Sequence, residues 1–330
     1  MCVLDTRLFI NDACVIDQWQ KAGYHASTHV LQLQKGQTLR FKIEFKEPQA
    51  NGRIRLFYET KKQLEKHFVP LEKAIAKANV AVFVVDFPEG EFQDRSSLRL
   101  APEQIALINE LKACGLPVVV VINGGSAVTM QEWQANSSAI LYAWYLGEAG
   151  GTALAHVLTG QVNPSGKLPI TIPQHEGQLP LSYWHEPTGR GNDYVNGTGE
   201  PLYPFGHGLS YTQFEYRDLK IVQTSLASND TLNLSFTIQN TGAYPGAEAL
   251  QFYIKPIYSS ETLPVQYLIR TEKTHLKNGE SKLYLHYKIP VAALGIPTGP
   301  KSTALPTQFY LQIGASSKDI RLQSPVITLS

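Results

Sequence analysis

The sequence holds only three cysteines among its 330 residues, so it offers little material for disulfides or zinc binding. Cys2, Cys14 and Cys114 are too few and too scattered for a disulfide framework, and no C-x-x-C pair is present. The nine histidines show no metal-ligand spacing either. We therefore expect no metal site, and we expect the cysteines to be small buried hydrophobic residues.

An excess of one charge sign is also missing. The sequence has 29 basic and 28 acidic residues, a net charge of +1, and no like-charge run longer than Lys61-Lys62. Nothing in it would steer a polyanion, so nucleic acid is not an expected partner. The apolar runs stop short of a membrane span, and Met1 to Ile10 carries Asp5 and Arg7 before any apolar run of a signal peptide forms. These features predict no membrane partner and a cytoplasmic location.

What the sequence does contain is a hydrophobic period that changes along the chain. Residues 1–60 alternate, with turn signals at Gly36 and Asn51-Gly52. From Lys61 the apolar residues recur three or four positions apart, which predicts a helix over 61–78 with a bend at Pro70. The alternating part predicts an antiparallel β module with short strands at 7–10, 14–17, 31–33, 39–45 and 53–58.

Residues 61–215 read as alternating helices and strands. Alternation of this kind favours an α/β sandwich, a mostly parallel sheet covered by helices. The stretch 174–199, rich in Gly, Pro and Asn, is predicted to be a long surface loop. The expected elements are strands at 80–85, 118–122 and 139–145 and helices at 102–115 and 147–158.

Residues 216–330 return to a period of two. Short strands separated by Asn, Gly and Pro turns are typical of an immunoglobulin-like β-sandwich. The fold class expected for the whole chain is therefore multidomain, α/β plus all-β. The strands of this last part are expected at 218–222, 231–239, 249–255, 282–289 and 308–313.

Three long motifs lie in the central part of the chain, at Ala143 to Gly151, Asn163 to Pro169 and Leu202 to Thr212. In sequence and in order they closely resemble glycoside hydrolase family 3. Long ordered matches are far more specific than a three-residue pattern. The resemblance implies a β-glycosidase, most like the β-glucosidase branch of the family.

The two ends of the chain extend the resemblance. Asn240-Thr241-Gly242, Leu250 to Tyr253 and Gly314 to Ser317 look like the fibronectin type III-like domain that closes many members. Arg7 to Asp17 and Arg53 to Glu59 are similar to the later strands of a PA14 module that some members carry. No segment resembles the TIM-type barrel with which such members begin, so the C-terminal portion alone is expected. The resemblance divides it into a partial PA14-like module (1–60), an α/β domain (61–215) and a fibronectin type III-like domain (216–330).

The predicted strand 80–85 runs directly into carboxylates. Asp86, Glu89 and Glu91 follow it, at the edge where open α/β folds place their chemistry. Exposed glutamates are the norm in loops, so these residues alone favour a solvated surface role. The resemblance favours catalysis, because the segment is similar to the acid/base loop of family 3. It implies Glu89 as the proton donor, Glu91 as the fallback, and Asp94 with Arg95 as a structural pair that shapes the loop.

Retaining glycoside hydrolysis needs a nucleophilic carboxylate about 5 to 5.5 Å from the acid, and it needs no cofactor. In the family the barrel carries that nucleophile, so no residue of this chain is assigned the role. Without a barrel, Glu89 is expected in open solvent, and the chain alone is expected to show negligible turnover. It would act on a β-glucoside or related oligosaccharide only together with a barrel, carried either by a missing segment or by a separately encoded polypeptide.

Two other functions stay open. One is a noncatalytic carbohydrate-binding or scaffolding protein that kept the β modules of such an enzyme. The other is a nonfunctional remnant that folds poorly. Trp184, in the predicted surface loop, is the tryptophan expected to contact a sugar, because an exposed indole ring can stack on a pyranose face.

Overall fold

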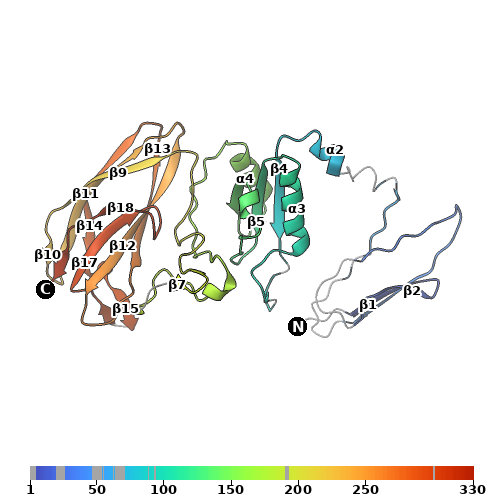
Figure 1. Ribbon diagram of the computed structural model, residues 1–330, viewed down its shortest axis with the longest axis horizontal. Coiled ribbons are helices and arrows are strands. Elements are labelled where there is room, and N and C mark those ends of the chain that lie inside the picture. Colours follow the sequence, from blue (N-terminus) through green and yellow to red (C-terminus); the bar gives the residue numbers. More distant parts are fainter. Residues whose placement is uncertain are drawn as a thin grey trace. The chain divides into compact units, whose positions relative to one another are not determined.

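The structure is a computed structural model of the 330-residue chain, and its helices and strands are labelled in Figure 1. The chain divides into two compact units, of which the first comprises Met1–Ser96, Ala106–Gly125 and Asn136–Tyr142 and the second the remainder. None of the described helices is long and apolar enough to cross a membrane. The structure describes residues 5–19, 27–46, 54, 56–61, 63, 71–87, 89–92, 94–189, 193–299 and 302–330.

Three antiparallel strands of the first unit form a sheet in the order β2-β1-β3. They are β1 (Asp5–Ile10), β2 (Ala13–Asp17) and β3 (Phe41–Lys46), which confirms the strands predicted at 7–10, 14–17 and 39–45. Asn11 and Asp12 join β1 to β2 with φ values of 47° and 69°, the left-handed conformation of a tight hairpin turn. The described residues within 31–33 and 53–58 form no strand, and residues 53 and 55 lie outside the described part.

The first unit also contains a parallel sheet in the order β4-β5-β6, which confirms the predicted parallel arrangement. Its strands are β4 (Ala81–Asp86), β5 (Val118–Asn123) and β6 (Ala139–Tyr142). Helix α3 (Pro102–Ala113) connects β4 to β5 and lies alongside them in Figure 1. The central strand β5 is the most hydrophobic, because both of its faces are covered. Its fully buried residues are Val118, Val120, Val121 and Ile122.

Strand β6 and helix α4 (Gly150–Leu158) are both shorter than predicted. The strand stops at Tyr142 rather than 145, and Trp144 has a φ of 57°, which extended backbone does not allow. The helix begins at Gly150 rather than 147. A Cβ at Gly150 would lie 2.5 Å from the Cβ of Leu146, so the chain can turn into the helix there only with glycine.

Of two other expectations, the helix over 61–78 is tested only in part and the burial of the cysteines is wrong. Of the helix predicted over 61–78, Leu71–Ile75 forms helix α2, while residues 64–70 lie outside the described part. Cys14 and Cys114 are exposed free thiols, so the expectation that they are buried is wrong. Cys14 lies on an exposed position of β2 and Cys114 just after α3.

The second unit contains a β-sandwich, as the alternating pattern predicted. One sheet has the order β14-β11-β9, and the other has the order β10-β19-β17-β12-β13 with β18 against β17. Separate small hairpins are formed by β7 with β8 and by β15 with β16. The strands are β7 (Asp193–Tyr194), β8 (Gly197–Thr198), β9 (Phe214–Ile221), β10 (Ser225–Leu226), β11 (Thr231–Asn240), β12 (Gly246–Tyr258), β13 (Tyr267–Leu276), β14 (Ser281–Pro290), β15 (Ile296–Gly299), β16 (Ser302–Ala304), β17 (Gln308–Gly314), β18 (Ile320–Gln323) and β19 (Ile327–Leu329).

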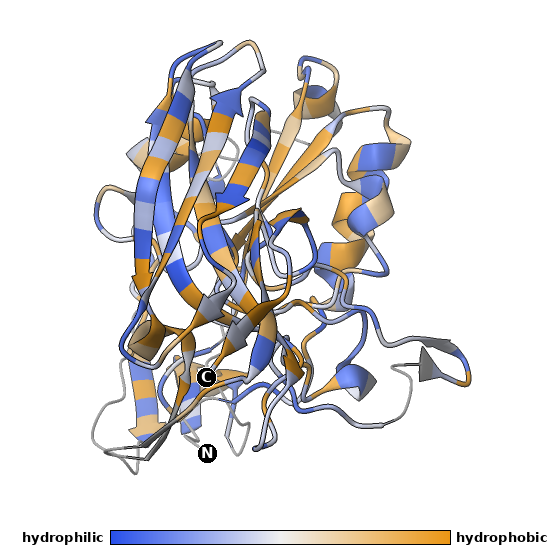
Figure 2. Ribbon diagram, turned by 90° about the vertical axis from the view of Figure 1, so that its left-hand side faces the viewer, coloured by the Kyte–Doolittle hydropathy of each residue, from blue (hydrophilic) through white to orange (hydrophobic). Residues whose placement is uncertain are grey.

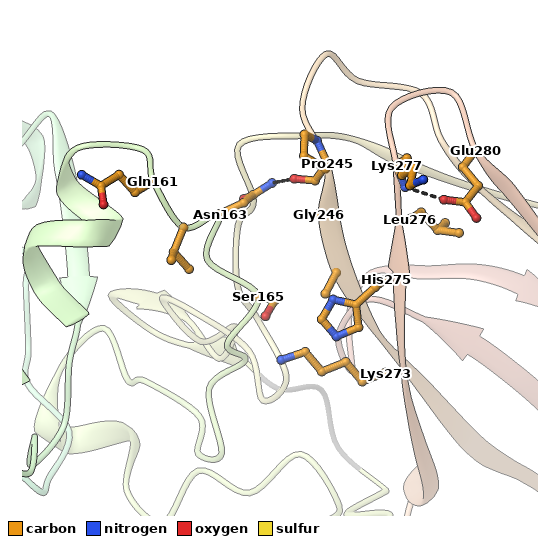
Figure 3. A pocket seen from close by; sticks show the side chains of 12 residues that line it. Gln161, Asn163, Ser165, Pro245, Gly246, Lys273, His275, Leu276, Lys277 and Glu280 are labelled. Carbon is orange, nitrogen blue, oxygen red and sulfur yellow. Dashed lines mark hydrogen bonds between the residues drawn. The ribbon is translucent and has the colours of Figure 1, made fainter. Parts of the chain in front are cut away.

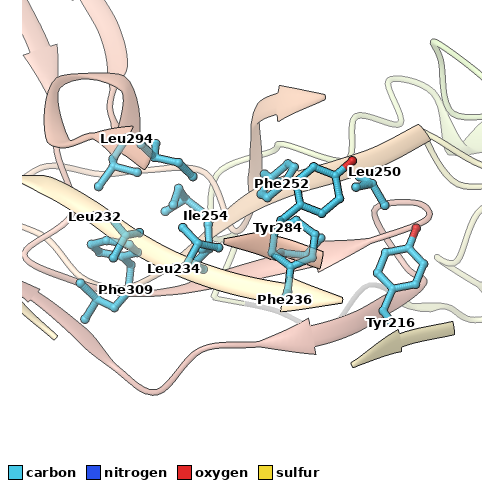
Figure 4. Packing of buried hydrophobic residues seen from close by; sticks show 14 of the residues in the cluster. Tyr216, Leu232, Leu234, Phe236, Leu250, Phe252, Ile254, Tyr284, Leu294 and Phe309 are labelled. Carbon is cyan, nitrogen blue, oxygen red and sulfur yellow. The ribbon is translucent and has the colours of Figure 1, made fainter. Parts of the chain in front are cut away.

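Inward side chains of the two sheets form the main hydrophobic core (Figure 4). Phe236 of β11 stacks on Tyr284 of β14 with 4.6 Å between ring centroids, and it meets Phe252 of β12 edge to face at 5.8 Å. Such aromatic pairs add to the free energy gained by burying their area. Figure 2 shows the alternation that makes this possible, as hydrophilic and hydrophobic bands along the sandwich strands.

A pair of identical substitutions tests this core. Leu234 of β11 is 1% exposed and Leu285 of β14 is 63% exposed. We expect Leu234→Ala to lower the free energy of unfolding by about 2–5 kcal/mol, because it leaves a cavity in a packed core. Leu285→Ala should stay within about 0.5 kcal/mol. Urea unfolding of both variants checks this, and equal losses would contradict the assignment of the two faces.

The stretch 174–199 is more ordered than a surface loop. It includes the 3-10 turn η2 (Glu176–Gln178) and the β7–β8 hairpin. Gln178 is 3% exposed, and its amide Nε2 donates to the carbonyl oxygens of Thr198 and Glu200, each at 3.1 Å. Its Oε1 accepts from the backbone N–H of Gln174 at 2.7 Å. One buried amide therefore ties the two ends of the stretch together.

Candidate functional site

The candidate site begins where two parallel strands end. Strand β4 ends at Asp86 and its neighbour β5 at Asn123, and these residues are partners in the register of the sheet. The Nδ2 of Asn123 donates to Oδ1 of Asp86 at 3.4 Å. Ligands of open α/β sheets bind outside the carboxyl ends of the strands. The loop that follows β4 and carries Glu89 and Glu91 therefore lies at the edge where a site is expected.

The carboxylate of Glu89 is held by two donors. Its Oε2 lies 3.3 Å from the Nε of Arg95, and its Oε1 accepts a hydrogen bond from the backbone N–H of Gly125. The side chains of Glu89 and Arg95 are only 11% and 12% exposed, so the expectation that Glu89 lies in open solvent is wrong. The guanidinium of Arg95 also lies over the ring of Phe87, 4.3 Å from its centroid. A cation and an N–H both favour the ionised form of a carboxylate.

Gly124 makes room for this arrangement. A Cβ on Gly124 would lie 2.6 Å from Cδ2 of Phe87 and 3.0 Å from Oε1 of Glu89. Both distances are shorter than an ordinary van der Waals contact, so any side chain at position 124 must push the Phe87 ring or the carboxylate away. The turn after β5 can therefore approach the loop after β4 only with glycine at this position.

This close approach predicts the effect of adding a methyl group. Gly124→Ala should lower the free energy of unfolding by about 1–3 kcal/mol, the usual cost of overpacking. Gly90 lies in the same loop, and a Cβ there would have no heavy atom within 4 Å. Gly90→Ala should change the stability by less than about 0.5 kcal/mol. Thermal unfolding followed by circular dichroism compares the two, and a tolerated Gly124→Ala would contradict the tight contact.

The other predicted site residues are exposed rather than held in this cluster. Glu91 and Asp94 are exposed, and the chain turns between them at Phe92, which has a φ of 62° and is 89% exposed. The ion pair of Arg95 is with Glu89 rather than with Asp94. Trp184 belongs to the second unit and is 52% exposed, so sugar contact at that residue stays a prediction.

Tyr142, the last residue of β6, adds a hydroxyl group near the two charges. Burial raises the pKa of Tyr142, and the Glu89 carboxylate raises it further while the Arg95 guanidinium lowers it. The phenol therefore keeps its proton at neutral pH and can donate a hydrogen bond. No group of three or more His, Cys, Asp and Glu side chains within the described residues could hold a metal ion.

Sequence reasoning did not find Gly124, Gly125 or Tyr142. The glycine pair follows a predicted buried strand directly, and that position at the edge of a parallel sheet is a usable signal. Tyr142 gives no such signal, because it falls inside an apolar stretch and reads as a core residue of the strand. Its place beside Glu89 and Arg95 depends on how β6 pairs with β5.

Comparison with known proteins identifies the family. Residues 16–211 match the glycosyl hydrolase family 3 C-terminal domain. The chain is 35% identical over 263 residues to the periplasmic β-glucosidase of Salmonella typhimurium, covering 76% of this chain and 34% of that protein. It is 36% identical over 245 residues to a β-xylosidase of Formosa agariphila, covering 73% and 34%. The chain thus spans about a third of the length of these curated relatives.

Comparison with solved structures supports the same family. A β-glucosidase from Listeria innocua in complex with glucose superposes with a TM-score of 0.73 at 27% identity, over 83% of this chain and 39% of that one. A β-glucosidase from Erythrobacter marinus superposes with a TM-score of 0.71 at 33% identity, over 78% and 36%. The resemblance carried by the three central motifs is thereby confirmed. The chain belongs to glycoside hydrolase family 3 and corresponds to the C-terminal portion of its members.

Proposed function

We propose that this chain is the C-terminal part of a retaining β-glycosidase and that the loop after β4 supplies the acid/base carboxylate. Family membership supports the reaction class, and the position of the loop at the carboxyl edge of the parallel sheet supports its role. The observation that carries the proposal is the contrast between two glutamates in one loop. Glu89 is bound by two donors, whereas Glu91 is exposed.

Because of this contrast, we propose different roles for the two glutamates. A general acid must come within hydrogen-bond reach of the leaving-group oxygen. Glu89 is 11% exposed and is held by the Arg95 guanidinium and the Gly125 N–H, which suits an anchor of the loop rather than a proton donor. Glu91 lies two residues further on with its side chain in solvent, where it can approach a leaving-group oxygen. We therefore assign proton donation to Glu91 and loop positioning to Glu89, which reverses the order preferred from the sequence.

The nucleophile is proposed to come from a segment outside residues 1–330, either of the same protein or of a partner polypeptide. The retaining mechanism requires its carboxylate about 5 to 5.5 Å from the acid. The proposed substrate is a β-glucoside or a related pyranoside, in keeping with relatives named β-glucosidase and β-xylosidase. We further propose that β1 to β3 are the end of a PA14 module and that the sandwich is a fibronectin type III-like domain.

An isolated chain with one half of the two-carboxylate site should be inactive. We expect the purified 330-residue chain to hydrolyse an aryl β-glucoside no faster than buffer does. The reason is that no nucleophile forms the glycosyl-enzyme intermediate. Release of the chromogenic phenol measures this directly. Turnover by the chain alone that disappears in Glu91→Gln would show that both carboxylates are present, and it would overturn the proposal that the nucleophile lies outside residues 1–330. The role of Glu91 itself is tested in the complete enzyme, as set out in the Discussion.

A further inference from the structure

The second unit contains a cleft apart from the glutamate loop. One wall is the segment that follows α4, with Gln161, Asn163 and Ser165, and the other wall is strand β13. The start of β12 forms the floor, at Pro245 to Ala247. The volume is about 710 Å³, within the range of small-molecule sites. Figure 3 shows the side chains of Lys273 and His275 pointing from β13 toward Ser165.

Asn163 holds the first wall to the floor. Its Nδ2 donates to the carbonyl oxygen of Pro245 at 2.9 Å, drawn as a dashed line in Figure 3. Its Oδ1 accepts from the hydroxyl of Ser210 at 2.9 Å and from the backbone N–H of Tyr211 at 2.8 Å. A Cβ on the adjacent Gly246 would lie 2.7 Å from Nδ2 of Asn163, so the floor also fits closely. The cleft is therefore preformed rather than opened by a ligand.

The charges in the cleft are mostly positive. Lys273 and His275 alternate with Thr274 and Leu276 along β13, so they share its exposed face while the other two are buried. Lys277 continues the same row. Within the described residues, no ion pair joins these three side chains to a carboxylate. Glu280 is the acidic residue of the lining, and its Oε2 already accepts from the backbone N–H of Lys277 at 2.6 Å.

The lining contains no Phe, Tyr or Trp, on which the face of a neutral sugar would stack. It does offer two lysines, a histidine and the Ser165 hydroxyl, all of which can donate to an oxyanion. We propose that this cleft binds a small ligand through a phosphate or carboxylate group, held by Lys273, His275 and Lys277 on one side and Ser165 on the other. Exposed lysines on an edge strand also discourage unwanted strand pairing. Protection of the strand edge would not require saturable anion binding, so a binding experiment distinguishes the two roles.

The test is an amide NMR titration of the full chain with inorganic phosphate, at ionic strength held constant with sodium chloride. Shifts of Ser165, Lys273 and His275 should saturate together. Lys273→Met and His275→Ala should each weaken binding about tenfold, the loss of one charge-assisted hydrogen bond. Lys288→Met is the matched control, because Lys288 is an exposed lysine on β14 outside the lining.

Titration with glucuronate forms the second arm. Saturation by phosphate alone would identify a phosphorylated ligand, and saturation by glucuronate alone a carboxylated one, and either result supports the site. Shifts that rise linearly with both anions would overturn the proposal. An equal loss of phosphate affinity in Lys288→Met and Lys273→Met would also overturn the proposal, because binding would then depend on the total charge of the protein rather than on the cleft.

Discussion

Replacing Glu91 by glutamine in the complete enzyme proposed above is expected to lower kcat by about 10²–10⁴-fold on glycosides with poor leaving groups, the usual contribution of a general acid. Such leaving groups cannot depart without a proton, which glutamine cannot supply. Aryl glycosides with strongly activated leaving groups should lose less in the first step, since their departure needs no protonation. The measurement is kcat against the pKa of the leaving phenol, which should show a steeper dependence in the variant than in the parent enzyme.

Rescue by azide distinguishes the proposed proton donor, Glu91, from the proposed anchor of the loop, Glu89. A small anionic nucleophile can attack the glycosyl-enzyme intermediate without a general base. With a strongly activated aryl glycoside, whose first step needs no acid, azide should therefore restore turnover to Glu91→Gln and release a glycosyl azide. Glu89→Gln keeps Glu91 but weakens the pair with Arg95, so its loss of activity should not be rescued. Rescue of Glu89→Gln and not of Glu91→Gln would return the donor role to Glu89.

Removing Arg95 should give the largest loss of stability among the charged residues of the site. Arg95→Met leaves the Glu89 carboxylate, 11% exposed, without the cation that lies 3.3 Å from it. Breaking a buried ion pair from one side typically costs about 3–5 kcal/mol. We expect a loss of that order in urea unfolding of the purified chain. The double variant Glu89→Gln with Arg95→Met should recover part of it, because no buried charge then remains at this pair.

A second arginine four residues away serves as the control. Arg99 pairs with Glu132 at 2.6 Å, a shorter distance than in the Arg95 pair, but these side chains are 57% and 46% exposed. Water and salt screen such a pair, so Arg99→Met should leave the urea midpoint unchanged within error. If Arg99→Met lowered the free energy of unfolding as much as Arg95→Met, burial of the ion pair would not explain the loss of stability.

The strands that the sequence predicts well are those whose pattern is produced by burial. The apolar run that became β5 is buried on both faces, and the alternation in β11 follows the two sides of the sandwich. Strand β13 was missed although it has ten residues. It lies at the edge of its sheet, and its outward row includes Lys273 and His275, so the segment is too polar to predict as a strand.

The candidate site was predictable only as a location. Carboxylates after an apolar strand pointed to this loop as the candidate, yet the proposed division between Glu89 and Glu91 depends on contacts that no local pattern contains. The N–H that holds Glu89 belongs to Gly125, 36 residues further along the chain. Exposure of Glu91 and burial of Glu89 follow from the packing of two loops. A reading of residue types along one segment cannot distinguish them.

The tight fit at Gly124 limits how this loop can be transplanted. The glutamates lie on the segment after β4, but the space for their anchor is encoded after β5, on a separate stretch of chain. An engineer who moves residues 87–95 into another α/β scaffold must also move Asn123 to Gly125. Without the glycine, the recipient scaffold would receive the two glutamates but not the backbone conformation that holds them. The two segments therefore form one exchangeable cassette, although more than twenty residues separate them in the sequence.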